Sequence, residues 1–461
     1  MTVLLLSLAL FALAMIAVIK PRVGILFVFP ILLLYPHSTK ALLPLPMHAG
    51  IDDLFIILLF LSTVPRVLGR GFPKGPTFKL AGAAVLLNTI ACLSNLLVFG
   101  PGPGQMGDFI IRQIIKQFLQ FACIFCMLES LDTVEECWRL VRWTVYAVVG
   151  AGVVIMLSSG FTAVREFFAV AKELQNGPVD PGRFSGSLFS ANSAAQILVY
   201  GMCLGIILVE RARRGRKLLW LIAPLLLLIS AAFTESRSGL FSMSLIPAVL
   251  LLMQGMRRWA IAYILGILCV PLIVPQFADM LIERVNHIFI TVGAESQMSS
   301  EAASRIGIWQ SFLHSMTPFT LIFGQDAQHA MLRAAARIGS KLMEPHSGYL
   351  NLLCYWGIPG VLWGGMLVAT QLRLMRNLKL HGGRDGLLWS RAMWLFIVVV
   401  LWESISLDSF HPASIGLLFV MAMLAITDRM EAITANESQD QPEFEETEMD
   451  AQGLPAYAAA R

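Results

Sequence analysis

Long apolar stretches, separated by short polar segments, run along most of the chain. A helix that crosses hydrocarbon needs about 20 mostly apolar residues, and thirteen stretches approach that length and composition. We therefore predict an all-α, polytopic transmembrane bundle of about 12–13 spans. The expected spans lie near residues 2–19, 23–36, 51–65, 80–99, 108–128, 141–158, 192–209, 218–233, 238–253, 259–275, 347–372, 391–408 and 411–427.

Two longer polar segments interrupt this pattern. Residues 159–191 and 276–346 carry too many charged side chains and histidines to lie in hydrocarbon, so we expect both outside the membrane. Each contains a predicted amphipathic helix of the kind that lies on a membrane surface, over 163–175 and 301–314. We therefore expect each segment to form a lid over one end of the bundle.

Lysine and arginine gather in alternate loops of the predicted bundle. Lys40 is the only such residue in the short loops at 37–50, 100–107 and 409–410. Because basic loops remain on the cytoplasmic side, the pattern predicts a cytoplasmic C-terminus and puts both polar segments on the outer face of the membrane. The basic loops are 20–22, 66–79, 129–142, 210–217, 254–258 and 373–391.

Composition agrees with a membrane protein. The chain is 57% hydrophobic and 14% charged, with a mean hydropathy of +0.71, against about 25% charged residues in a soluble domain. We expect no nucleic acid partner. Six of the seven cysteines fall in apolar stretches, so no disulfide framework is indicated. Cys123 and Cys126 have the spacing of a redox or zinc pair, but inside an apolar helix they are more typical of packing residues.

The chain divides into three regions on these grounds. Residues 1–158 hold the first group of spans, and residues 159–427 hold both polar segments and the remaining spans. Residues 428–461 contain nine acidic and two basic residues with few large apolar ones. Such a composition cannot form a core, so we expect a disordered, acidic cytoplasmic tail.

Several arginines lie outside the basic loops, close to the predicted outer face. Arg112 and Lys116 share one helix face, Arg183 precedes a span, Arg237 occupies a tight turn between two spans, and Arg305 lies in the long polar segment. Each could be an interfacial arginine that extends its charge into water. If several converge, their planar guanidiniums would form a phosphate or diphosphate site.

A histidine follows proline where the long segment returns to the membrane, in Glu344-Pro345-His346-Ser347-Gly348-Tyr349. Pro345 favours a helix that starts there, and the positive end of the helix dipole would keep the imidazole neutral. Neutral His346 could then take a proton from an attacking hydroxyl. The alternative is an interfacial histidine hydrogen-bonded to a carbonyl group. Glu344 and Tyr349 could orient the ring or bind sugar.

Four motifs occur in order along residues 180–370. Together they resemble the O-antigen ligase and polysaccharide polymerase superfamily, although Ser347 stands where that family usually has asparagine. The motifs are Arg183-x-x-Gly186 followed after five residues by Asn192, Ser236-Arg237-Ser238-Gly239, Arg305-x-x-Ile308-Trp309, and His346-Ser347-Gly348-Tyr349-Leu350 at the start of a span.

The resemblance implies a glycosyltransferase of the bacterial inner membrane with its site facing the periplasm. Its donor would be an oligosaccharide linked to undecaprenyl diphosphate. The diphosphate would be bound by Arg183, Arg237 and Arg305, with Arg112 as a further candidate, and His346 would be catalytic. Asn192 would support the site. Because guanidiniums can neutralise a diphosphate leaving group, we expect no metal and no cofactor.

The acceptor divides the superfamily into two reactions. A polymerase extends an exopolysaccharide or O-antigen, whereas a ligase joins glycan to lipid A-core or to a protein; we favour the polymerase and keep the ligase as the alternative. Membrane lipids are expected partners, and chain-length regulators or export proteins are candidate partners. A transporter or flippase is less favoured, because no internal repeat is evident and Glu403 and Asp408 are the main charges within a span.

Overall fold

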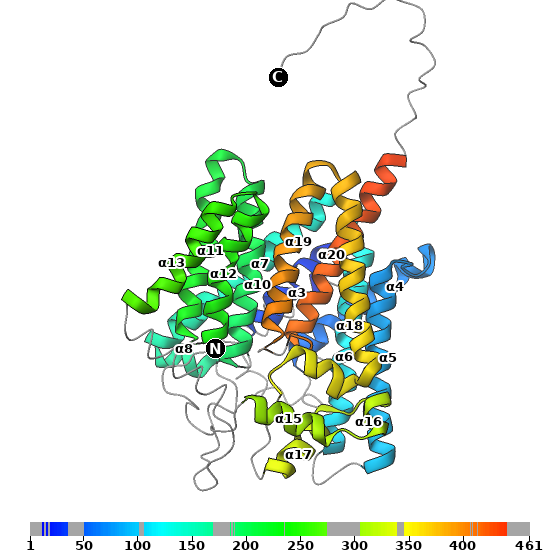
Figure 1. Cartoon of the computed structure of the whole chain (residues 1–461). Helices are drawn as coiled ribbons and strands as arrows, with labels where there is room; N and C mark the ends of the chain where they lie inside the picture. Colours follow the sequence, from blue (N-terminus) through cyan, green and yellow to red (C-terminus); the bar gives the residue numbers. More distant parts are fainter. Residues whose placement is uncertain are drawn as a thin grey trace, which may run out of the picture.

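The computed structural model is helical in every element that it describes (Figure 1). The prediction of an all-α fold is therefore confirmed, while the expected span near 2–19 falls mostly outside the described residues. Those residues are 12, 15, 16, 19–35, 50–100, 106–168, 185, 188, 190–234, 236–273, 305–338, 345–405, 407, 409–412 and 414–439.

The first half of the described chain begins with short helical pieces and continues in long helices. Their bounds are α2 (Pro21–Gly24), η1 (Ile25–Phe27), α3 (Val28–Leu34), α4 (Ile51–Arg70), α5 (Pro76–Phe99), α6 (Met106–Ser130), α7 (Val134–Gly160), α8 (Thr162–Phe168) and α10 (Ala191–Arg211).

The second half alternates long helices with a group of short ones. Their bounds are η4 (Arg214–Arg216), α11 (Lys217–Phe233), α12 (Arg237–Met253), α13 (Arg257–Ile273), α15 (Arg305–Ser315), α16 (Pro318–Phe323), α17 (Ala327–Ile338), α18 (Gly348–His381), α19 (Gly383–Glu403) and α20 (Ile415–Gln439).

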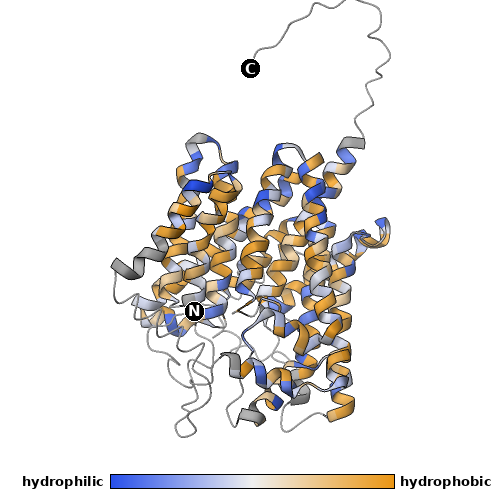
Figure 2. Ribbon diagram, viewed as in Figure 1, coloured by the Kyte–Doolittle hydropathy of each residue, from blue (hydrophilic) through white to orange (hydrophobic). Residues whose placement is uncertain are grey.

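Six described helices are long and apolar enough to cross a membrane, namely α5, α6, α7, α10, α18 and α19. Shorter apolar helical segments cover 21–34, 220–233 and 238–253. Figure 2 shows the hydrophobic residues along the long helices and the hydrophilic ones gathered towards their ends. The described residues thus form a polytopic helical membrane bundle, as predicted.

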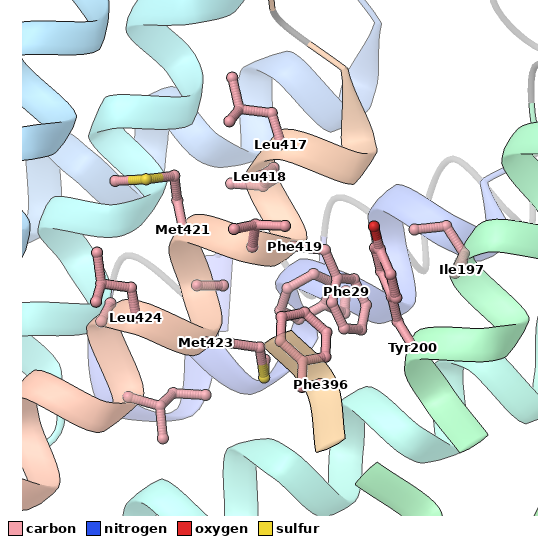
Figure 3. Packing of buried hydrophobic residues seen from close by; sticks show 14 of the residues in the cluster. Phe29, Ile197, Tyr200, Phe396, Leu417, Leu418, Phe419, Met421, Met423 and Leu424 are labelled. Atoms are coloured by element: carbon pink, nitrogen blue, oxygen red, sulfur yellow. The ribbon is translucent and has the colours of Figure 1, made fainter. Parts of the chain in front are cut away.

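Helix α20 lies at the centre of the bundle. Its side chains from Leu417 to Ile426 are all at most 5% exposed, and a helix that is apolar on every side is expected to be buried. Phe419 packs against Phe29 of α3, with ring centroids 4.9 Å apart, and against Tyr200 of α10, at 5.6 Å (Figure 3). The core therefore joins segments from both halves of the chain.

The basic loops meet at one end of the bundle. Arg211, at the end of α10, binds Asp385 at the start of α19 (3.0 Å) and Glu135 at the start of α7 (2.9 Å). At the same end Arg22 pairs with Asp132. Helices α15, α16 and α17, which belong to the long polar segment, lie together at the opposite end (Figure 1).

The last helix continues beyond the predicted end of the membrane region. Helix α20 extends to Gln439, and buried Asp428 accepts a hydrogen bond from the backbone amide of Thr77 at the start of α5 (3.1 Å). The expectation of a disordered tail from residue 428 is therefore wrong as far as Gln439. The composition of residues 428–461 did not reveal this, because residues 428–439 were averaged with the acidic residues that follow them.

Helix α18 has a sharp kink that seats α16 against it. Gly357 has φ +68°, in the left-handed region that favours glycine. A Cβ at this position would lie 2.5 Å from the carbonyl oxygen of Leu321 in α16. The kink thus lets α16 pack closely against α18.

Candidate functional site

The segment that carries His346 is held on both sides. The indole Nε1 of Trp309 in α15 donates to the carbonyl oxygen of Pro345 (2.8 Å). On the other side, the amide of Gly348 (2.8 Å) and the hydroxyl of Ser347 (3.2 Å) both donate to the carbonyl oxygen of Ser404. His346 therefore sits between helix α15 and the end of α19.

The helix after His346 starts later than the sequence suggests. It begins at Gly348 with Ser347 as its N-cap residue, so the prediction that Pro345 opens the helix is wrong. The reason is that Gly348 approaches α19 and Phe410 closely, with room for no Cβ, and this contact fixes the first turn. His346 precedes the cap and has φ +47°, which is uncommon for a residue other than glycine.

Asn192 and the first turn of α12 lie side by side. The hydroxyl of Ser236 donates to the side-chain oxygen of Asn192 (3.1 Å). A Cβ on Gly239 would be 2.5 Å from Cβ of Ala195, so α10 and α12 approach closely here. Arg237 is the first residue of α12. The motif that ends at Asn192 and the motif Ser236-Arg237-Ser238-Gly239 are therefore in contact.

A buried polar cluster links this helix pair to the segment that follows α19. The side-chain amide of Gln196 (2.7 Å) and the hydroxyl of Tyr200 (3.3 Å), both in α10, donate to the hydroxyl of Ser409. Ser409 follows Ser404, which binds the start of α18. The N-terminal ends of α10, α12 and α18 therefore lie at one end of the bundle, connected through the segment that follows α19. The first turn of a helix has amide groups without an intrahelical partner and carries a partial positive charge.

The remaining predicted residues differ in how the structure places them. Arg305 is the first residue of α15, whose Trp309 contacts Pro345. Tyr349 donates its hydroxyl to the carbonyl oxygen of Leu401 (2.7 Å), so it secures α18 to α19. Arg112 is half-buried on α6. Arg183 and Glu344 lie outside the described residues.

Lys116, one turn after Arg112, forms an ion pair with Asp53. The Nζ of Lys116 lies 2.5 Å from Oδ1 of Asp53, which is 4% exposed on α4. The sequence placed Lys116 on the same helix face as Arg112 and gave it no role of its own. The buried carboxylate instead gives Lys116 a structural partner.

Several polar residues at the end of the bundle that carries His346 received no role in the sequence analysis. Glu403, noted above only as a charge within a span, is 1% exposed beside Ser242 of α12. Ser404 and Ser409 connect the helices described above, and no local sequence signal marks them. Asp408 lies outside the described residues.

No group of three or more His, Cys, Asp or Glu side chains in the described part of the chain is arranged to hold a metal ion. All six cysteines described by their side chains, including Cys123 and Cys126, are buried as free thiols. Cys126 accepts from the hydroxyl of Thr63 (3.6 Å), in keeping with a packing role.

Comparison with known proteins supports part of the sequence interpretation. Residues 222–363 match the family model described as O-antigen ligase. The match runs from α11 into α18, covers under half of the chain, and includes Arg237, Arg305 and His346. It confirms the resemblance to the O-antigen ligase and polymerase superfamily. No curated protein matches the chain.

Proposed function

We propose that the protein is a membrane glycosyltransferase that works at the end of the bundle where α10, α12 and α18 begin. The observation that carries the proposal is that these three helices begin at the end of the bundle that also carries His346, within and next to the region that matches the O-antigen ligase family. Helix N-termini attract anions. This end is therefore suited to a diphosphate on a lipid-linked glycan.

The donor that fits is an oligosaccharide linked to undecaprenyl diphosphate. Arg237, at the first position of α12, adds a full positive charge to a helix N-terminus. Its guanidinium can donate two parallel hydrogen bonds to phosphate oxygens. With Arg183 and Arg305 as further candidate ligands, the arginines would stabilise the charge that grows on the departing diphosphate without a metal.

His346 is the proposed general base. A hydroxyl of the acceptor would attack the anomeric carbon while the imidazole takes its proton. The new glycosidic bond forms as the bond between that carbon and the diphosphate oxygen breaks, and undecaprenyl diphosphate leaves with the electron pair. General base catalysis of this kind contributes about 10²–10⁴-fold.

The end that carries His346 would face the periplasm. The basic loops lie at the opposite end, where Arg211 and Arg22 make their ion pairs, and basic loops are normally cytoplasmic. Lipid-linked glycans exposed on the outer leaflet of the inner membrane would then reach the site.

Polymerisation of exopolysaccharide or O-antigen repeat units is the first candidate reaction. Ligation of glycan to lipid A-core is the second, and the description of the matched family as O-antigen ligase favours it. Chain-length regulators and export proteins remain candidate partners of the polymerase alone.

Turnover by purified protein tests the proposal and separates the two reactions. The protein in lipid nanodiscs would receive lipid-linked oligosaccharide with labelled sugar, either alone or with lipid A-core. A ladder of longer lipid-linked products indicates a polymerase, and a single labelled product that requires lipid A-core indicates a ligase. Unchanged donor under both conditions would contradict the proposed function.

A further inference from the structure

A second polar cluster lies at the outer end, away from the residues assigned above. It is built on the turn between α16 and α17, where Gln325 and Asp326 are fully buried and His329 is 7% exposed. The turn is fixed from two sides. Asn95 of α5 donates to the carbonyl oxygen of Gly324 (3.0 Å), and the amide of Gln325 donates to the carbonyl oxygen of Tyr355 in α18 (3.0 Å).

Asp326 orients the imidazole of His329. One carboxylate oxygen accepts from the backbone amide of His329 (3.0 Å), and the other lies 2.5 Å from Nδ1 of the ring. An ionised carboxylate can only accept, so Nδ1 carries a proton, and Nε2 is an acceptor when the ring is neutral and a donor when it is protonated. Nε2 makes no hydrogen bond with any residue that the structure describes.

Two hydrogen-bond donors accompany this acceptor. Arg333, one turn after His329, lies 3.7 Å from the ring centroid of Phe99 and donates through Nη1 to the side-chain oxygen of Gln325 (3.3 Å). Arg333 Nη2 and Gln325 Nε2 are buried and have no hydrogen-bond partner among the described residues. Leaving such a group unpaired costs about 1–3 kcal/mol, so an oxygen acceptor bound to these two donors would stabilise the cluster.

The set of hydrogen-bonding groups favours one kind of ligand. A carboxylate or a phosphodiester can only accept, so it satisfies the two donors but pairs with Nε2 of His329 only when the ring is protonated. A sugar hydroxyl both accepts and donates, so neighbouring hydroxyls on one sugar ring satisfy all three groups. Phe99, which is 41% exposed, and Phe319, with ring centroids 6.3 Å apart, provide apolar surface beside them.

The cluster is connected to the segment of His346 through α15. Ser311 of α15 donates to the carbonyl oxygen of Ala334 in α17 (2.7 Å), while Trp309, half a turn away, donates to Pro345. We propose that Gln325, His329 and Arg333, with Asp326 as the positioning residue, form a glycan-binding subsite that takes a hydroxyl-rich sugar unit of the acceptor. Its assignment to the acceptor rests on the proposed function.

Binding of sugar by the full-length protein in detergent tests the subsite. The probes are methyl glycosides of glucose, galactose, mannose and N-acetylglucosamine, with cyclohexanemethanol as the hydroxyl-poor control, and the readout is saturation transfer from protein to ligand. We expect one or more glycosides to bind and the control compound not to bind. Equal signals from glycosides and control, or none from any glycoside, would overturn the inference.

Asp326→Asn is the sharpest variant. The asparagine oxygen can still accept from the amide of His329, whereas its NH₂ group would donate to Nδ1 and move the ring proton to Nε2. The sugar hydroxyl that donated to Nε2 must then turn to accept from it and loses the hydrogen bonds of its first orientation, so we expect about tenfold weaker sugar binding, as for Arg333→Met. His314→Gln, at an exposed histidine of α15, should bind as the wild type does. Wild-type affinity in both Asp326→Asn and Arg333→Met would overturn the subsite.

Arg237→Lys separates this inference from the proposed function. That variant should lose turnover of lipid-linked donor and keep sugar binding. If the wild type lacks turnover while Asp326→Asn still loses sugar binding, the function fails and the subsite stands. If the wild type turns over donor while Asp326→Asn binds sugar unchanged, the subsite fails and the function stands.

Discussion

At the scale of the residue, backbone geometry and hydrogen bonds give His346 its place. Its φ of +47° is held because Pro345 and Gly348 on either side are bonded to α15 and α19. A left-handed residue other than glycine costs of the order of 1–2 kcal/mol, so both contacts must oppose that strain. The sequence identified the histidine but could not indicate these contacts, because Trp309 and Ser404 come from distant segments.

Arg237→Lys should reduce glycan transfer at least tenfold, because lysine keeps the charge but cannot donate two parallel hydrogen bonds to a phosphate. The measurement is turnover of labelled donor, normalised to the amount of protein in the membrane. Arg258→Lys, at an exposed position in the first turn of α13 at the basic end, is the matched control and should be fully active. Full activity of Arg237→Lys would make Arg237 an interfacial anchor.

At the scale of the element, hydropathy located the helices well but misjudged their ends. Helices α7, α18, α19 and α20 all extend further at the basic end than their apolar stretches. Charged residues such as Glu, Lys and Arg are good helix formers, so a helix continues into water after its apolar residues end. At the other end, the start of α18 depends on packing of Gly348 against α19, which no local pattern reveals.

Gly357→Ala should destabilise the protein and impair its activity, since the left-handed backbone and the 2.5 Å approach to the Leu321 carbonyl leave no room for a methyl group. We expect a loss of at least 1 kcal/mol, measured as a lower thermal midpoint in detergent. Gly365→Ala in the same helix meets nothing within 4 Å and should leave the midpoint unchanged or slightly raised. Equal midpoints for the two variants would show that the kink tolerates a side chain.

Asp428→Ala should lower the same midpoint, because buried Asp428 satisfies the amide of Thr77 in the first turn of α5. Loss of such a cap costs about 0.5–2 kcal/mol. Exposed Glu437, in the last turns of α20, offers the control substitution Glu437→Ala. If both variants unfold together with the wild type, α20 does not secure α5.

At the scale of the whole molecule, the basic loops lie at one end of the bundle and the candidate site around His346 lies at the other. The alternation of basic loops predicted this division, and the described helices place those loops together. The meeting of α10, α12 and α18 could not be predicted, because it depends on buried contacts such as Gln196 with Ser409. Motif order along a chain shows which residues belong together without showing how their helices pack.

Orientation in the membrane can be read by labelling introduced cysteines in intact spheroplasts. The native cysteines described by their side chains are buried, so background labelling should be low. Gln310→Cys, exposed on α15, should react with an impermeant maleimide, and Gly215→Cys, exposed at the basic end, should react only after lysis. The reverse result would put the proposed site in the cytoplasm.

His346→Ala tests the central claim most directly, when turnover and donor binding are measured on the same purified protein. The imidazole acts only as the hydroxyl attacks, whereas the arginines and helix N-termini hold the diphosphate. We therefore predict that His346→Ala loses at least 10²-fold in turnover and retains lipid-linked donor as the wild type does, with His314→Gln unchanged in both. Substantial turnover by His346→Ala, or a folded variant that no longer retains the donor, would contradict the role of His346 as the base.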